Sequence, residues 1–427
     1  MIISELHELF LHHRVVSTDS RNCPKDCLFF ALKGEKFDGN QYAASALKSG
    51  AAFAIIDNPE YEVPDRTILV DDVLNTLQQL ARMHRKTMNI PVIGITGTNG
   101  KTTTKELIAT VLSTKYNTLY TQGNLNNQIG VPLTLLRLTY EHEIAVIEMG
   151  ASHPGDIAEL VRIACPNYGI ITNVGKAHLE GFGSFENVIK TKGELYDYIR
   201  KINGKIFIHN GNNYLQSIAH KIEQITYGEE GSFTSGKAIQ GSSPFLTLDW
   251  KQQGKIHTVN THLIGNYNLE NVLAAIAIGR YFKIPSERIN RAITAYEPTN
   301  NRSQFMQTPN NTLIIDAYNA NPSSMKVAIE NFEKLEVAPK AVILGDMREL
   351  GASSEEEHTA IVQQLEEGKF DKVFLCGEQF AKVGKQYMLF PSTEELIRTL
   401  KEHPLKGYHI LIKGSRGMKL EQTLNYL

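Results

Sequence analysis

At its most informative point the chain reads Val92-Ile93-Gly94-Ile95-Thr96-Gly97-Thr98-Asn99-Gly100-Lys101-Thr102-Thr103-Thr104. A β-branched apolar run ends in a glycine-rich turn, and a Lys-Thr pair then opens a helix that we expect from about Thr103 to Leu112. Glycines let backbone N–H groups curl around phosphate oxygens, and a helix N-terminus adds partial positive charge. We therefore predict an ATP-binding phosphate loop made of Gly97, Thr98, Asn99, Gly100, Lys101, Thr102 and Thr103.

The loop departs from the common pattern G-x-x-x-x-G-K-[ST] at one position, because Ile95 stands where the first glycine belongs. An ordinary glycine turn between a strand and a helix is the structural alternative. The Lys-Thr pair at the helix start favours phosphate binding. In this interpretation Lys101 reaches the β- and γ-phosphates, and the Thr102 hydroxyl ligates Mg²⁺.

Length and composition narrow the class of protein. The 427 residues are 42% hydrophobic, enough for roughly two to four domains with cores of their own. The formal net charge of −2, without a long Lys/Arg block, argues against a general nucleic-acid binder. No signal-peptide pattern starts the chain, and no apolar run approaches the ~18 residues of a membrane span. The chain has four cysteines, too few for a disulfide framework: Cys23, Cys27, Cys165 and Cys376. We therefore expect a reduced, cytoplasmic protein.

Three segments follow one another along the chain. Segment 1–86 mixes short apolar runs with helical stretches, and segment 87–297 carries the phosphate loop. The central segment alternates strands with helices, apart from period-two runs at about 232–263 that indicate an antiparallel patch. Segment 298–427 alternates again. This pattern predicts an α/β fold of three domains with mostly parallel sheets.

Polar side chains follow two predicted strands of the central segment. Glu148 ends the apolar run 144–147, where phosphate-loop proteins carry a Mg²⁺ ligand. His178 follows a later strand and is a candidate second metal ligand or phosphate contact, although an ordinary loop histidine is the commoner case. Lys192 lies close by. A bare ammonium would repel Mg²⁺, so Lys192 is a poor metal ligand unless it is modified, and a solvated lysine is the structural alternative.

Amide and carboxylate groups gather at further places. Asn268 and Asn271 offer paired donors and acceptors that suit a purine edge, and helix capping is the alternative for Asn268. The run Asp316-Ala317-Tyr318-Asn319-Ala320-Asn321-Pro322 joins a strand to a helix, either as a ligand-binding edge of a sheet or as a simple Asn-Pro turn. Asp346 is another strand-end carboxylate, and Lys413-Gly414-Ser415-Arg416 offers cations for an anionic group.

Taken together, these residues resemble the Mur ligases of peptidoglycan synthesis over essentially the whole chain. The loop matches the family form Thr-Gly-Thr-Asn-Gly-Lys-Thr, which explains Ile95. The branch that adds D-alanyl-D-alanine to a UDP-muramoyl tripeptide is similar in four stretches: Gly123–Pro132, Glu148–Ala151, Asn173–Ser184 and Asp316–Pro322. The branch that adds the third residue would show Asp-Asn-Pro-Arg, which is absent. Folylpolyglutamate synthetases share the loop but lack Asp19-Ser20-Arg21 with Asp38-Gly39, which resembles a uridine-nucleotide site.

The resemblance implies a role for each site residue. It implies two Mg²⁺ ions held by Thr102, Glu148, His178 and a Lys192 that CO₂ has carbamylated, and a catalytic group of Lys101, Glu148, His178 and Lys192. It places Asn268 and Asn271 at adenine, Arg302 at the phosphates and Asp316 at the ribose. The substrate-binding residues it implies are Ser20, Arg21, Asp38, Gly39, Asn126, Asn127, Asn319 and Asn321. Tyr267 departs from the family, since many relatives have His there.

The implied activity is ATP-dependent amide ligation. The carboxylate of the tripeptide attacks the γ-phosphate of ATP, and D-alanyl-D-alanine captures the resulting acyl phosphate, with the third domain closing over the second. Two alternatives stay open: a phosphate-loop NTPase or switch without ligase activity, and a Mur or folylpolyglutamate-type ligase with another acceptor. No motif tells diaminopimelate from lysine in the tripeptide, and a monomer is the default expectation.

Overall fold

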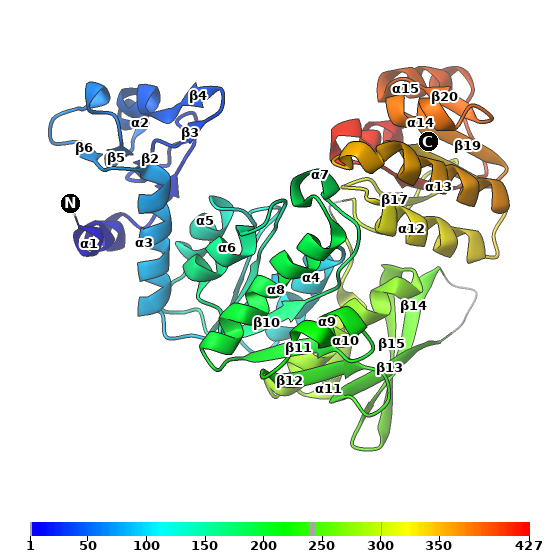
Figure 1. The fold of residues 1–427 in the computed structure, drawn as a ribbon, viewed down its shortest axis with the longest axis horizontal. Coiled ribbons are helices and arrows are strands. Elements are labelled where there is room, and N and C mark those ends of the chain that lie inside the picture. Colours follow the sequence, from blue (N-terminus) through cyan, green and yellow to red (C-terminus); the bar gives the residue numbers. More distant parts are fainter. Residues whose placement is uncertain (1, 240–243, 300) are drawn as a thin grey trace.

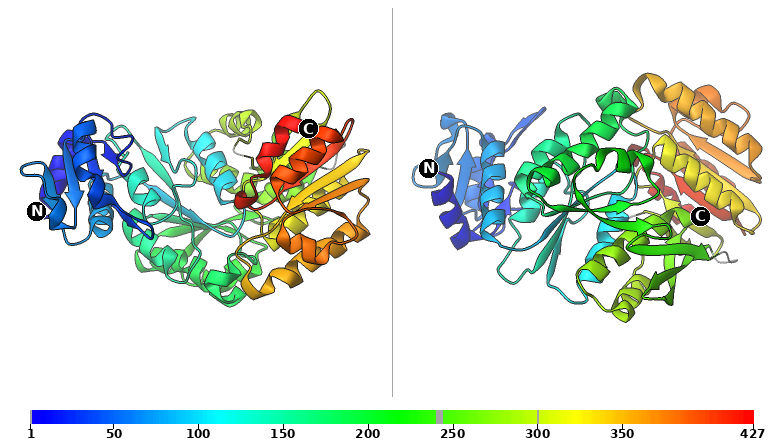
Figure 2. Two further views of the ribbon diagram at one scale, coloured as in Figure 1. Left: turned by 90° about the horizontal axis from the view of Figure 1, so that it is seen from above. Right: turned by 60° about the horizontal axis from the view of Figure 1, so that its bottom comes forward.

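The computed structural model describes residues 2–239, 244–299 and 301–427. Its strands form three main sheets that follow one another along the chain, and Figure 1 shows three bodies built around them. Figure 2 (left) shows these bodies as an arc, with the N-terminal and C-terminal bodies at opposite ends. The sheets are mixed but mostly parallel, which confirms the predicted α/β fold.

The first sheet is parallel and has the strand order β1-β2-β5-β6. Its strands are β1 (Val16–Ser17), β2 (Leu28–Phe30), β5 (Phe53–Ile56) and β6 (Thr67–Leu69). An antiparallel pair, β3 (Lys33–Gly34) and β4 (Phe37–Asp38), stands apart from this sheet. The helices of this body are α1 (Ile3–His13), α2 (Ala43–Ser49) and α3 (Val73–Thr87).

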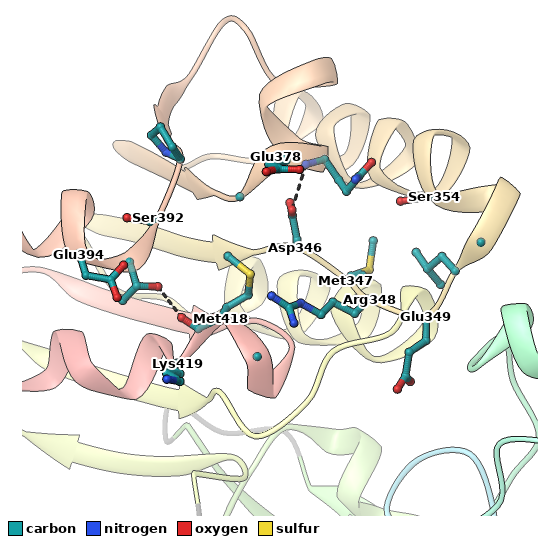
Figure 3. Close-up of a pocket in the computed structure, with 17 residues that line it drawn as sticks. Asp346, Met347, Arg348, Glu349, Ser354, Glu378, Ser392, Glu394, Met418 and Lys419 are labelled. Carbon is teal, nitrogen blue, oxygen red and sulfur yellow. Dashed lines mark hydrogen bonds between the residues drawn. The ribbon is translucent and has the colours of Figure 1, made fainter. Parts of the chain in front are cut away.

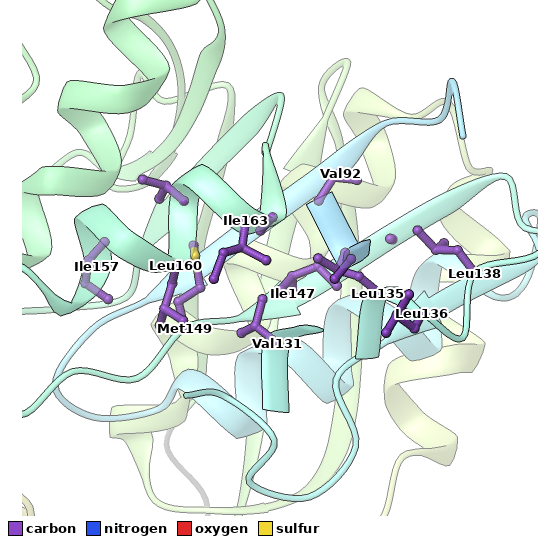
Figure 4. Close-up of a cluster of buried hydrophobic side chains, with 14 of the residues drawn as sticks. Val92, Val131, Leu135, Leu136, Leu138, Ile147, Met149, Ile157, Leu160 and Ile163 are labelled. Carbon is purple, nitrogen blue, oxygen red and sulfur yellow. The ribbon is translucent and has the colours of Figure 1, made fainter. Parts of the chain in front are cut away.

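Helix α3 joins the first body to the second. Asp72 caps its start, because the carboxylate accepts a hydrogen bond from Asn75 N. Its apolar residues, among them Leu77, belong to one buried cluster together with side chains of the central body. Figure 4 shows side chains that the central body contributes to this cluster. At its other end the buried Arg85 donates to the carbonyls of Met88, Ala164 and Cys165 and to Asn167 Oδ1. Both apolar packing and charge-assisted hydrogen bonds therefore fix the joint.

The central sheet has nine strands in the order β15-β14-β13-β12-β11-β10-β7-β9-β8. Its parallel part contains β7 (Val92–Thr96), β8 (Thr118–Tyr120), β9 (Ile144–Glu148), β10 (Tyr168–Ile171), β11 (Lys205–His209) and β12 (Glu223–Gly228). The predicted antiparallel patch is confirmed: β14 pairs in this way with both neighbours. These strands are β13 (Thr234–Ile239), β14 (Phe245–Gln252) and β15 (Lys255–Ile264).

Helices cover both faces of the parallel part (Figure 1). One buried cluster includes side chains of α5 (Gly130–Leu135), α6 (Asp156–Ala164) and α8 (Phe185–Lys201). The other includes α4 (Lys101–Leu112), α10 (Leu269–Tyr281) and α11 (Ser286–Ala295). Two shorter helices are α7 (Leu179–Phe182) and α9 (Asn213–Ile218). Because β7 lies inside this sandwich with every residue buried, the loop that follows it has a rigid support.

The third sheet has the order β16-β17-β21-β18-β19-β20. Its strands are β16 (Gln304–Gln307), β17 (Thr312–Asp316), β18 (Lys340–Gly345), β19 (Lys372–Cys376), β20 (Met388–Phe390) and β21 (His409–Lys413). Apart from β16 these strands are parallel, so their polar carboxyl ends share one edge. The helices here are α12 (Pro322–Lys334), α13 (Ser354–Glu367), α14 (Glu378–Val383) and α15 (Thr393–Glu402). Among the described residues no helix is long and apolar enough to span a membrane.

Candidate active site

The predicted phosphate loop lies between β7 and α4. Gly97 has φ +146° and Gly100 has φ +76°, which are left-handed values that favour glycine. A Cβ at Gly97 would lie 1.9 Å from Thr172 Oγ1, so the loop also needs glycine for space. Helix α4 starts at Lys101, two residues earlier than predicted, because Gly100 turns the backbone directly into the helix.

Lys101 fills the hollow of its own loop. Its ammonium donates to the carbonyls of Gly97 (2.8 Å) and Thr98 (3.0 Å). The pKa of Lys101 is lowered to about 8: burial is the main cause, Glu148 opposes it, and the nearby charge of Arg302 adds to it. A phosphate group that entered this hollow would favour the charged lysine.

Glu148 ends β9 beside the loop and is buried. Its Oε1 accepts hydrogen bonds from Thr102 Oγ1 (3.2 Å) and Asn126 Nδ2 (2.8 Å), while its Oε2 is buried with no hydrogen-bond partner among the described residues. A hydroxyl and an underused carboxylate oxygen side by side are suitable ligands for Mg²⁺, which also retains water molecules. In the described part of the chain no group of three or more His, Cys, Asp or Glu side chains could hold a metal ion.

Lys105 is a site residue that the sequence reasoning missed. It is fully buried, and its Nζ lies 3.7 Å from both Glu148 Oε2 and Glu106 Oε1. The positive charge of Lys105 therefore balances the negative charge of Glu148, the predicted magnesium ligand. Its spacing of four residues from Lys101 on one helix was the available signal, since such residues share a face.

Two asparagines at the start of α10 lie against the loop. Asn271 Oδ1 accepts from Thr104 Oγ1 (3.0 Å), and Asn271 Nδ2 donates to Asn268 Oδ1 (2.8 Å). Asn268 Nδ2 in turn donates to Ile264 O (2.8 Å). Asn268 occupies the N-cap position of α10, but its side chain makes no capping hydrogen bond. This chain of amides connects α4 to α10, and the predicted contact with adenine remains a prediction.

The C-terminal body supplies the opposite wall. Asp316 and Lys413 end the neighbouring strands β17 and β21 and form an ion pair. Asn321 caps α12 by accepting from Ser324 N, and its Nδ2 donates to Asn99 Oδ1 (2.8 Å) of the phosphate loop. The Asn-Pro pair therefore starts a helix, and the same Asn321 side chain also connects the C-terminal body to the central body.

One cavity of about 870 Å³ lies between these walls. Most of the predicted site residues line it: Thr98, Asn99, Gly100, Lys101, Thr102, Thr103, Asn126, Asn127, Glu148, His178, Asn268, Asn271, Arg302, Asp316, Asn319 and Asn321. Gly97 and Lys192 are not among the lining residues. Tyr267 also lines the cavity, and its hydroxyl lies 2.6 Å from Ser303 Oγ of the C-terminal body.

His178 and Lys192 were both predicted to be ligands of Mg²⁺, and in the structure each contacts another side chain. His178 Nδ1 lies 2.5 Å from Glu349 Oε2 of the C-terminal body, and this contact with His178 lowers the pKa of Glu349. Lys192 is only 3% exposed, and its Nζ lies 5.7 Å from the centre of the Phe182 ring. Burial, followed by the charge of Lys101, holds the pKa of Lys192 well below its usual range.

A second cavity of about 570 Å³ lies at the carboxyl edge of the C-terminal sheet (Figure 3). Glu349 lines both cavities. Asp346, the other predicted strand-end carboxylate, accepts hydrogen bonds from Gln379 N and Phe380 N at 2.9 Å each. Its side chain therefore holds the first turn of α14.

The residues predicted for a uridine nucleotide lie in the N-terminal body and line neither cavity: Asp19, Ser20, Arg21, Asp38 and Gly39. Arg21 forms an exposed ion pair with Asp19 at 2.8 Å, and its hydrogen bonds lower the pKa of Asp19 to about 2. Asp38 accepts from Asn40 N and Nδ2, which fixes the turn at Gly39. The turn needs glycine, because a Cβ there would lie 2.3 Å from Leu32 O.

Comparison with known proteins agrees with this arrangement. The profile described as "Mur ligase family, catalytic domain" matches residues 12–85, "Mur ligase middle domain" matches 95–279, and "Mur ligase, glutamate ligase domain" matches 301–416. The chain belongs to the Mur ligase family.

Relatives of this Mur ligase span nearly its full length. UDP-N-acetylmuramoyl-tripeptide--D-alanyl-D-alanine ligase of Bacillus subtilis (strain 168) is 37% identical over 96% of this chain and 92% of its own. Crystal structure I of MurF from Acinetobacter baumannii is 30% identical, with a TM-score of 0.87 over 96% of this chain and 92% of that one. MurF ligase from Thermotoga maritima in complex with ADP has a TM-score of 0.87 and 28% identity over 97% of both chains.

Proposed function

We propose that this Mur ligase joins D-alanyl-D-alanine to UDP-N-acetylmuramoyl-tripeptide and converts ATP to ADP and phosphate. The observation that carries the proposal is the 37% identity over 96% of the chain to a Bacillus subtilis enzyme of that name. The cavity between the phosphate loop and the C-terminal sheet supports it, because ligation must bring three substrates together. We place the reaction in the cytoplasm, in keeping with four free thiols.

The nucleotide is the best supported ligand of the cavity. The named relative from Thermotoga maritima was crystallised with ADP, and here the loop offers backbone N–H groups, Lys101 and the start of α4. We assign Arg302 to the phosphates and Asp316 to the ribose. Thr102 and Glu148 fit a Mg²⁺ ion. When bound, such an ion would offset the repulsion between the triphosphate and the attacking carboxylate.

The chemistry then proceeds in two steps. A carboxylate oxygen of the tripeptide bonds to the γ-phosphorus, the bond to the β–γ bridging oxygen breaks, and ADP leaves. The amine of D-alanyl-D-alanine adds to the acyl carbon, loses a proton, and the tetrahedral intermediate expels phosphate to leave the amide. Lys101 and Arg302 supply fixed positive charge where negative charge develops. The amide bridge between Asn321 and Asn99 holds the walls of the cavity together.

We propose that Lys192 acts as a carbamate. Only a neutral amine attacks CO₂, and burial keeps the pKa of Lys192 low, so the neutral form is accessible. The amine nitrogen bonds to the carbon of CO₂ and loses one proton, which leaves an anionic oxygen ligand in place of a repelling cation. His178 would join the same metal only after it releases Glu349.

Phosphate release tests the proposed function directly. Release should require ATP, the muramoyl tripeptide and D-alanyl-D-alanine together. Equal release with and without the two peptide substrates would favour the NTPase alternative. Release with a different acceptor would favour another ligase of the same fold.

The carbamate has its own test. Lys192→Ala should abolish ligation, and added short carboxylates should partly restore it because they replace the missing oxygen ligand. Lys190→Ala, on the exposed side of the same helix, is the matched control. Full activity of Lys192→Ala without any additive would refute the carbamate.

A further inference from the structure

Tyr318 is a half-buried residue of the large cavity that the proposed reaction does not use. It follows β17, and arginines from two other loops contact its ring. We propose that Tyr318 is a positioning residue that holds the guanidinium of Arg302 in the orientation in which it meets the nucleotide phosphates. This inference rests on the proposed function, because it assumes that the cavity binds ATP.

The contact with Arg302 is close. Arg302 Cζ lies 3.7 Å from the centre of the Tyr318 ring, a distance at which a planar guanidinium stacks on an aromatic face. Arg302 Nε is buried and has no hydrogen-bond partner in the described residues. Among the described residues the Arg302 side chain makes no hydrogen bond or ion pair, so the Tyr318 ring is its main support.

The second arginine, Arg416, contacts Tyr318 from the loop that follows β21. Arg416 Cζ lies 5.3 Å from the ring centre, and Arg416 Nη1 donates to the Tyr318 hydroxyl at 3.4 Å. Arg416 follows β21, the strand next to β17, so two adjacent strand ends place the hydroxyl and its donor. Tyr318 therefore has two separable parts: the ring, which supports Arg302, and the hydroxyl, which Arg416 tethers.

Orientation matters because Arg302 faces the phosphate loop across the cavity. Its charge is near enough to lower the pKa of Lys101, which lies in the hollow of that loop. A flexible arginine would lose rotamer freedom each time a phosphate bound, whereas a stacked guanidinium has already lost it. The ring thus favours phosphate binding without touching the nucleotide.

The test measures the dissociation constant of ADP by calorimetry for the full-length chain. Tyr318→Leu should weaken ADP about threefold to thirtyfold, the equivalent of one cation–π contact. Tyr318→Phe keeps the ring and should stay within about twofold of the wild-type value. Tyr426→Leu is the matched control, because Lys401 contacts that exposed ring in the same body at 4.7 Å.

A double-mutant cycle separates positioning from direct contact. If Tyr318 acts through Arg302, Tyr318→Leu should have no further effect on ADP affinity in an Arg302→Ala background. Equal losses in both backgrounds, or equal losses for Phe and Leu, would overturn the inference. If Tyr318→Leu does not fold, Arg302→Lys tests the same contact, since it keeps the charge but not the stacking plane and should weaken ADP similarly. Wild-type protein that does not bind ADP would instead overturn the proposed function.

Discussion

Replacing Lys192 with methionine should make the protein more stable and inactive at once. The lysine is 3% exposed, and no hydrogen bond or ion pair to its ammonium is found among the described residues. Methionine has nearly the same length without the polar group. A buried polar group without a partner costs about 1–3 kcal/mol, so Lys192→Met should raise the free energy of unfolding by about that amount. For a domain of 150–250 residues this corresponds to about 2–4 °C in Tm for each kcal/mol.

The effect should depend on pH with a defined sign. Burial holds the pKa of Lys192 below the ordinary 10.5, so the folded protein binds fewer protons there than the unfolded chain does. Wild-type stability therefore rises with pH through the window between the two values, and the advantage of the variant shrinks toward pH 10. Below that window the full advantage is present.

Thermal unfolding in CO₂-depleted, metal-free buffer at several pH values measures this difference. Lys190→Met, an exposed position on the same helix, should change stability by less than about 0.5 kcal/mol. A Lys192→Met protein that melts below wild type at pH 7 would show that the ammonium is well satisfied in the fold, and the reasoning about its neutral form would be wrong.

Three further outcomes are expected. Asn271→Ala should weaken ADP binding and leave uridine-nucleotide binding unchanged, as measured by calorimetry with each nucleotide; unchanged ADP affinity would remove its assigned role. ADP affinity should fall about tenfold between pH 7 and pH 9, because the Lys101 pKa of about 8 means that the charged form is lost across this range. Lys101→Arg should make ADP affinity independent of pH in this range, and a wild-type affinity that does not change with pH would contradict the role of Lys101. Gly97→Ala should abolish ADP binding, as measured by equilibrium dialysis, since the added Cβ would collide with Thr172 Oγ1. Normal binding would show that the loop has room for a side chain.

The periodic parts of the sequence predicted the fold well. The apolar run before the glycine-rich turn and the run 144–147 were expected to be strands, and they lie in β7 and β9, in which every residue is buried. The antiparallel patch was visible because period-two alternation differs from the continuous apolar runs of parallel strands. The start of α4 was misjudged by two residues, since the sequence does not show that Gly100 adopts a left-handed conformation.

Contacts between bodies could not be predicted in the same way. Glu349 is about 170 positions from His178 along the chain, and no local pattern signals that they meet. Tyr318 was visible within a polar run, yet its stacking on Arg302 depends on how two loops cross. Lys105 was missed for another reason: its spacing from Lys101 places it on the same face of the helix, but a lysine in a helix is usually exposed, and the sequence does not show that this one is buried.

The rigid joint at α3 has a consequence for the donor substrate. The hydrogen bonds of Arg85 and the shared apolar cluster hold the first body against the second. On the proposed assignment, one end of the donor is gripped near Arg21 and its carboxylate must arrive beside Lys101. With the first body held in this place, a muramoyl peptide that is one residue shorter would end farther from Lys101, so the joint would select substrates by the length of their peptide.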